Sequence, residues 1–277
     1  MLVLRGKGYK VSCIRYYVWA RNCNYSYIIH STKYILHKTM SGHSHWAGIK
    51  QRKGVNDAKR ANVFTKYGRL ITIAAKEGGG KPEMNFKLKM AIDSARYVNM
   101  PKETIERAIK KGTGELKDGA EIEEIIYEGY GPGNVAMLIK TATDNRNRTG
   151  SEVRSILTKA GGKPAAEGGV KFMFKLVGNI AVAVGDKDPY DVEMAAIEAG
   201  AEDTIFEGDI VVVYTKVEDL QKVKENLDTM GLQIEGAELV YAPVQKTELD
   251  PESKIDYERL LEKLDENDDV QEIYDNL

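Results

Sequence analysis

Residues 40–69 read MSGHSHWAGIKQRKGVNDAKRANVFTKYGR, a strongly basic stretch in which Asp57 is the one acid. Within it the apolar residues begin to recur at helical spacing, which predicts a helix over residues 56–77 with Asn56 or Asp57 as its N-cap. A run of three glycines and then Pro82 ends that helix. Two further amphipathic segments, residues 86–98 and 101–112, complete a small helical bundle. Residues 40–115 are therefore expected to form a basic arm and a helical domain.

Charge is separated along the chain, although the formal net charge is only −2. Residues 1–39 hold 7 basic residues and no acid, residues 40–115 hold 16 basic and 7 acidic residues, and residues 116–277 hold 17 basic and 35 acidic residues. A basic front on an acidic remainder favours a polyanionic partner for the front. The alternative is an ordinary solvated surface with a large dipole.

Residues 1–39 differ from the rest in composition. They contain both cysteines, Cys13 and Cys23, so the remainder has no thiol for a disulfide or a metal site. They have no acid, as in a mitochondrial transit peptide, but many aromatic residues and no secretory signal pattern. The favoured interpretation is that the gene model begins too early and that Met40 is the true first residue. Residues 1–39 are then expected to be disordered. We expect a cytoplasmic protein, or a mitochondrial one if the segment is a transit peptide. No apolar run approaches the roughly 20 residues that cross a bilayer, so no membrane partner is expected.

After residue 120 the pattern changes to that of β-strands. Residues 122–127 and 135–139 predict a hairpin around the glycine-rich turn at 129–134. A helix is expected from Gly150 or Ser151 to Ala160.

A second unit follows between residues 170 and 238. It is predicted as strands 172–176 and 180–184 turning at Gly178-Asn179, helix 189–199, hairpin 204–215, helix 217–230 and strand 232–239. The order ββαββαβ indicates a ferredoxin-like sandwich. A strand over 244–249, a helix to Leu264 and a terminal strand over 270–274 complete the chain.

The expected fold class is α+β with three domains. An N-terminal helical bundle (40–115) precedes an α+β domain (116–169 plus 239–277) that carries an inserted ferredoxin-like α+β domain (170–238).

Motifs of catalysis are absent from the sequence. It contains no Walker loop, no GxGxxG after a strand, no HExxH and no GxSxG. A glycine-rich turn such as 129–133 can cradle a phosphate, but a hairpin turn explains these glycines fully. The paired acids Asp268 and Asp269 are expected to be solvated. We therefore expect no enzyme, no cofactor, no metal and no small-molecule substrate.

Three groups of residues are candidates for nucleic-acid binding, because Lys and Arg contact phosphates while aromatic and amide side chains contact bases. Trp46 has an alternative role as a hydrophobic staple, and the junction at 145–149 an alternative as a capped loop with surface arginines. The arm contributes His43, His45, Trp46, Lys50, Arg52 and Lys53; the first helix contributes Lys59, Arg60, Lys66 and Arg69; the junction contributes Asn145, Arg146, Asn147 and Arg148.

Several motifs together resemble the YebC/PmpR family, whose relatives include the mitochondrial translational activator of cytochrome oxidase subunit one. They are MSGHSHWAGIK at 40–50, FTK at 64–66, NMPK at 99–102, IERAI at 105–109, TDNRNRT at 143–149, GAED at 200–203 and DDVQ at 268–271. The resemblance covers residues 40–277 and implies the three-domain fold reached above.

The resemblance also implies a cytoplasmic DNA-binding regulator of transcription. A translation factor that acts on the ribosome and contacts ribosomal RNA is the alternative within the family. The sequence shows no recognition helix of the helix-turn-helix kind, so the basic arm suits DNA and RNA equally. A third hypothesis is a protein-interaction adaptor that uses the acidic residues 250–277.

Overall fold

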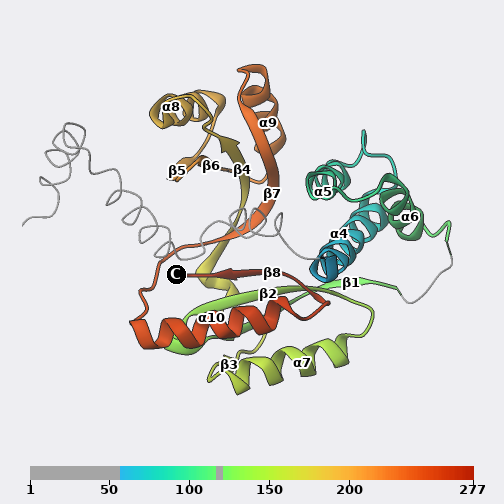
Figure 1. Cartoon of the computed structure of the whole chain (residues 1–277), viewed down its shortest axis with the longest axis vertical. Helices are drawn as coiled ribbons and strands as arrows, with labels where there is room; N and C mark the ends of the chain where they lie inside the picture. The colour runs from blue at the N-terminus through green and yellow to red at the C-terminus, as the bar shows by residue number, and fades with distance from the viewer. Residues whose placement is uncertain (1–56, 117–120) are drawn as a thin grey trace, which may run out of the picture. The chain divides into compact units, whose positions relative to one another are not determined.

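The computed structural model describes residues 57–116 and 121–277 (Figure 1). The fold is α+β, as expected. The described residues form seven α-helices and two four-stranded sheets in which all neighbouring strands run antiparallel.

Three helices precede the first sheet: α4 (Asp57–Gly78), α5 (Phe86–Tyr97) and α6 (Lys102–Gly112). Their core includes the fully buried Ile71 of α4 and Leu88 of α5. Asn85 fixes the corner between α4 and α5, because its Oδ1 accepts from the Leu88 N–H at 3.0 Å while its Nδ2 donates to the Ala74 carbonyl at 2.7 Å. At the end of α6, Gly112 allows close packing on α4, since a Cβ there would lie 2.4 Å from the Thr72 carbonyl oxygen. The expected helical bundle is thus observed over the described residues.

The first sheet has the order β3-β1-β2-β8. Its strands are β1 (Glu123–Tyr130), β2 (Ala136–Thr143), β3 (Lys163–Pro164) and β8 (Val270–Asp275), and a 3-10 turn, η1 (Pro132–Asn134), joins β1 to β2. Helices α7 (Arg146–Lys159) and α10 (Pro251–Asp265) lie on one face (Figure 1). Leu157 of α7 and Leu260 of α10 are fully buried there against Met137 and Ile139 of β2. The predicted hairpin and terminal strand are confirmed.

The glycine-rich turn between β1 and β2 is closely packed. A Cβ on Gly133 would lie 2.1 Å from Leu249 Cδ2, and a Cβ on Gly131 would lie 3.0 Å from the Tyr257 ring. Side chains beside α10 therefore fill the turn, and the hairpin explanation of these glycines is the one that the packing supports.

The second sheet has the order β5-β6-β4-β7. It is built from β4 (Phe174–Ala183), α8 (Pro189–Ala199), β5 (Asp203–Glu207), β6 (Ile210–Thr215), α9 (Leu220–Thr229) and β7 (Gln233–Pro243), and a short 3-10 turn, η2 (Lys171–Met173), leads into β4. Both helices pack on the face that carries Val182, Val211 and Val213. The connectivity βαββαβ is the split βαβ arrangement of ferredoxin-like folds.

The predicted turn at Gly178-Asn179 is wrong, because β4 is one continuous strand. Gly178 pairs with Thr215 on one side and Leu239 on the other, so it lies in the middle of the sheet. A Cβ at Gly178 would lie 2.2 Å from Thr215 Oγ1. The glycine therefore marks a close approach of neighbouring groups within a strand and not a reversal of the chain.

The predicted strand over 244–249 is also wrong. β7 instead continues to Pro243, and no strand is assigned between Pro243 and α10. Two backbone bonds hold this connection, from Val244 N to the Met173 carbonyl at 2.9 Å and from Thr247 N to the Asn276 carbonyl at 2.6 Å.

The strands of the second sheet lie, in sequence, between β3 and β8 of the first sheet. An inserted domain requires this order. The domain boundaries themselves stay a prediction, and β7 runs across the expected boundary at residue 239.

Candidate nucleic-acid interface

The candidate residues of the arm lie outside the described residues. Lys59 and Arg60 belong to the first turn of α4. The arm residues concerned are His43, His45, Trp46, Lys50, Arg52 and Lys53.

Lys66 is buried, with 5% of its surface exposed. Its Nζ donates to Oδ1 of Asp265 at 2.8 Å and to the Asp265 carbonyl oxygen at 2.9 Å. Asp265 is the last residue of α10, where a cation is favoured by the carbonyl groups at the helix end. Lys66 thus joins α4 to the C-terminus of α10.

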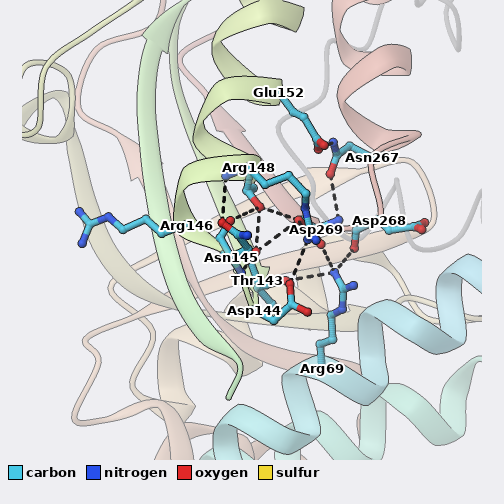
Figure 2. A network of polar contacts seen from close by, with 12 residues as sticks. Arg69, Thr143, Asp144, Asn145, Arg146, Arg148, Glu152, Asn267, Asp268 and Asp269 are labelled. Carbon is cyan, nitrogen blue, oxygen red and sulfur yellow. Dashed lines mark hydrogen bonds and ion pairs between the residues drawn. The ribbon is translucent and has the colours of Figure 1, made fainter. Parts of the chain in front are cut away.

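Arg69 lies one turn further along α4 and is also engaged. Its Nη1 donates to Oδ1 of Asp269 at 2.6 Å, to the Asp268 carbonyl at 2.7 Å and to the Ala142 carbonyl at 3.1 Å (Figure 2). The guanidinium therefore connects α4 to the end of β2 and to the turn before β8.

Asp269 is the centre of this polar cluster, and only 4% of its side chain is exposed. Besides Arg69 on Oδ1, its Oδ2 accepts from Arg148 Nη2 at 2.7 Å and from the Thr149 hydroxyl at 2.5 Å (Figure 2). Burial by itself raises the pKa of Asp269, but the bonds from Thr149, Arg148 and Arg69 outweigh it, so the pKa lies below its usual value. The carboxylate thus ties together α4, α7 and the start of β8.

The residues at 145–149 form the beginning of α7, so the expected start at Gly150 or Ser151 is wrong. Asn145 is the N-cap, because its Oδ1 accepts from the Arg148 N–H at 3.1 Å. Its own N–H donates to the Thr143 hydroxyl at 2.9 Å. Helix capping by an asparagine therefore places the helix start four or five residues earlier than the glycine and serine suggested.

The other three junction candidates follow Asn145 in the first turn of α7. Arg148 is held by Asp269 and also by Asp144 Oδ1 at 3.1 Å, which leaves its side chain 44% exposed. Arg146 and Asn147 are exposed, and the Arg146 side chain points away from the cluster (Figure 2). The Arg146 carbonyl is anchored by the Tyr127 hydroxyl at 2.9 Å.

The outer face of α7 carries further positive charge. Arg154 and Lys159 are exposed on the same helix, whose one acid, Glu152, accepts from Asn267 Nδ2 at 2.8 Å. α7 as a whole has four basic residues against this one acid.

A groove of about 370 Å³ lies between α4, α6 and the residues leading into β1, and we call it the basic groove. Arg69, Arg107 and Lys111 line it, and no acid is among its described lining residues. Phe64, Leu116 and Ile122 form an apolar part of its wall. Arg107 and Lys111 were missed from the sequence, although their spacing of four on a helix places them on one face.

The acids near the C-terminus were expected to be solvated, and for Asp269 this is wrong. Asp268 is exposed, but Asp269 is buried in the cluster. Glu272 is likewise inside, where it pairs with Lys140 at 3.2 Å, and Asp275 accepts from the Tyr257 hydroxyl at 2.7 Å. Several acids of residues 250–277 thus act as internal counter-ions and acceptors.

Within the described ranges, no helix is both long and apolar enough to cross a membrane. The same residues contain no cluster of three or more His, Cys, Asp or Glu side chains with a geometry suited to a metal ion.

Comparison with known proteins gives a consistent result. A family model described as "TACO1/YebC protein N-terminal domain" matches residues 44–115, and one described as "TACO1/YebC second and third domain" matches residues 122–277. Proteins from Roseiflexus castenholzii and Persephonella marina, each named "Probable transcriptional regulatory protein", are 49% identical over 242 residues, which cover 86% of this chain and 95% of theirs.

A solved structure agrees. The crystal structure of a conserved hypothetical protein from Aquifex aeolicus matches with a TM-score of 0.75 and 44% identity, over 79% of this chain and 90% of that chain. This chain is therefore similar to proteins that are named as probable regulators of transcription. The chain belongs to the TACO1/YebC family.

Proposed function

We propose that this protein is a cytoplasmic nucleic-acid-binding regulator of gene expression that acts without catalysis, first of all a DNA-binding regulator of transcription. The observation that carries the proposal is the basic groove, in which Arg69, Arg107 and Lys111 meet with no acid among the described lining residues. The basic residues of the groove belong to residues 40–115, which contain 16 basic and 7 acidic residues. Such a surface attracts the phosphate backbone, mainly through release of counter-ions.

The candidate residues divide into two roles in this proposal. Lys66 and Arg69 are paired with Asp265 and Asp269, so they position α4, and Arg69 gives the groove only part of its charge. Direct contacts to phosphate are assigned to Arg107 and Lys111 of the basic groove, to the arm, to Lys59 and Arg60 of α4, and to the exposed Arg146. Because few amide or arginine side chains remain to read bases, we expect binding with low sequence specificity.

A translation factor that binds ribosomal RNA is the second candidate, and one observation favours it. The wall of the basic groove includes Phe64, Leu116 and Ile122, so the groove combines cations with an apolar surface. Unstacked bases of single-stranded RNA loops pack on such surfaces, whereas the bases of duplex DNA are stacked and not available.

The third candidate, an adaptor using residues 250–277, has less support. Asp265, Asp269 and Glu272 are paired with Lys66, Arg69 and Lys140 of the same chain, and Asp269 and Glu272 are buried. Acids with internal partners offer little charge to an external one.

The test is a fluorescence anisotropy titration of the full chain with a labelled DNA duplex and a labelled RNA hairpin, over a series of salt concentrations. The variant, which we call the arm variant, replaces Lys50, Arg52 and Lys53 of the arm and Lys59 and Arg60 of α4 with Ala. If each side chain neutralises one phosphate, the slope of log K against log salt should flatten by about 4.5 for duplex DNA, at about 0.9 per phosphate.

The matched control removes the same charge elsewhere by replacing the exposed Lys175, Lys187, Lys216, Lys222 and Lys246 with Ala. This control should bind nearly as tightly as the parent. Equal affinity and equal salt slope for the parent and the five-residue arm variant would refute the proposed interface.

Sedimentation of the tagged protein through a sucrose gradient of cell lysate, with and without RNase, distinguishes the ribosome from DNA as its target. Comigration with ribosomal particles that is lost in the arm variant supports the translation factor. Absence from these fractions together with salt-dependent duplex binding supports the transcriptional regulator.

A further inference from the structure

Helix α8 of the second sheet is apolar on two opposite sides. Val192, Ala196 and Ala199 are buried against the sheet and α9. Tyr190, Met194 and Ile197 are instead exposed, by 65%, 48% and 54% respectively. Three large apolar side chains exposed within eight consecutive helical residues exceed the scattered exposure that is normal for a protein surface.

These three exposed residues form one stripe along the helix. Their spacings of four and three residues place them within an arc of about 60°, at about 100° per residue. The same geometry puts the stripe on the side of α8 opposite to Val192, Ala196 and Ala199. The stripe therefore contributes nothing to the core of the second sheet and faces away from it.

Negative charge surrounds the stripe. Residues 188–209 contain eight acids and no base. On α8 itself, Asp191 and Glu198 lie on one flank of the stripe and Glu193 lies on the other. An apolar stripe between two acidic flanks is the complement of a helix that has apolar residues on one face and Lys or Arg beside them.

The negative charge beside the stripe also favours one kind of binding partner over the others. A nucleic acid or an anionic membrane surface would be repelled by these acids. A second copy of this chain would bring Asp191, Glu193 and Glu198 against the same acids, which is unfavourable. A basic amphipathic segment of another protein buries the stripe and neutralises the flanks.

We propose that α8 is a docking site for a basic amphipathic helix of a partner protein, bound through Tyr190, Met194 and Ile197. The site is separate in residues and opposite in charge from the basic groove. The protein would then hold a polyanion through residues 40–115 and a basic protein segment through α8.

The test uses the full chain and a fluorescent 16-residue peptide of leucine and lysine, with the leucines at helical spacing. Anisotropy is measured for the parent and for Ile197→Glu, which places a charge in the stripe. The matched control is Ile255→Glu, which adds the same charge at a 53% exposed isoleucine on the acidic helix α10. An isomeric peptide with scrambled leucine positions controls for attraction by charge alone.

We expect Ile197→Glu to weaken binding of the helical peptide at least about tenfold and Ile255→Glu to change it less than about twofold. The parent should bind the scrambled peptide more weakly. Equal binding of both peptides, equal loss in both variants, or no binding by the parent would overturn the proposal. Self-association of the parent that Ile197→Glu abolishes would overturn it as well, in favour of a second copy as the occupant.

Failure of this proposal is distinguishable from failure of the nucleic-acid proposal. Ile197→Glu should leave duplex and hairpin affinities at the values of the parent, because the residue lies in α8 and not in the basic groove.

Discussion

Replacing Asp269 with Asn should markedly destabilise the protein while changing its shape very little. The amide has nearly the same size as the carboxylate but no charge. The substitution would leave Arg69 and Arg148 without their shared counter-ion. The new amide NH2 group would also point at groups that donate hydrogen bonds in the parent, namely Arg69 on one side or Arg148 and Thr149 on the other.

The magnitude follows from the contacts. Hydrogen bonds to a charged group contribute about 1.5–3 kcal/mol each, and removal of one partner of a buried ion pair costs about 3–5 kcal/mol. Solvent screens part of the Arg148 contact, because that side chain is 44% exposed, whereas Arg69 is 22% exposed. We expect the loss to be about 3 kcal/mol, which at about 2–4 °C per kcal/mol lowers Tm by about 6–12 °C.

The assay is thermal unfolding at pH 7 followed by far-UV circular dichroism. Asp268→Asn is the control, since it removes the same charge from the adjacent residue, whose carboxylate is exposed and points away from the cluster (Figure 2). Surface changes of this kind usually stay within about 0.5 kcal/mol. A Tm for Asp269→Asn within about 2 °C of that of Asp268→Asn would refute the view of Asp269 as a structural centre.

Three further predictions concern Asp269, Glu128 and Lys66. Folding lowers the pKa of Asp269, so its contribution to the free energy of unfolding is present above the unfolded pKa of about 3.9 and is lost as pH falls through the folded pKa. The Tm difference between the parent and Asp269→Asn should therefore shrink below about pH 4, and a difference that stays constant with pH would contradict this. Glu128→Gln should accelerate amide exchange either at Gly168 or at Val170 and Lys171. One carboxylate oxygen of Glu128 accepts from the Gly168 N–H at 2.6 Å and the other accepts from the Val170 and Lys171 N–H groups at 2.6 and 2.8 Å, whereas an amide has a single accepting oxygen; unchanged exchange at all three residues by mass spectrometry would argue against it. Lys66→Met should destabilise the chain by about 1–3 kcal/mol in urea unfolding, because it removes the two hydrogen bonds from Lys66 Nζ to the carbonyl and carboxylate of Asp265, and a midpoint equal to that of the parent would count against that role.

Local patterns predicted most helices and hairpins well. α8 was predicted over its observed range, since Asp188 and Pro189 at its start and Gly200 at its end are strong local signals. Gly178 shows where such signals fail. A glycine between apolar residues indicates either a turn or a close approach, and the residues that decide between them, Thr215 and Leu220, lie about forty positions away in the sequence.

The candidate site was predicted less completely, for a related reason. Composition gives the charge of a segment but not the partner of each side chain. Lys66 and Arg69 were predicted as contacts to a polyanion, yet they meet Asp265 and Asp269, which are 199 and 200 residues further along the chain. The paired acids Asp268 and Asp269 are adjacent in sequence but differ in burial, and only the folded chain distinguishes them.

The internal pairing is compatible with the proposed binding of a polyanion by an acidic chain. Residues 116–277 hold 35 acids against 17 bases and would repel phosphate if all were solvated. Where α4 contacts α10 and β8, however, Asp265 and Asp269 are neutralised by Lys66, Arg69 and Arg148. Their field is thus cancelled beside the basic groove, where Arg107 and Lys111 add positive charge. The base-free run of acids at 188–209 lies on α8 and β5 of the second sheet, so its negative charge is available for a basic partner without opposing the groove directly.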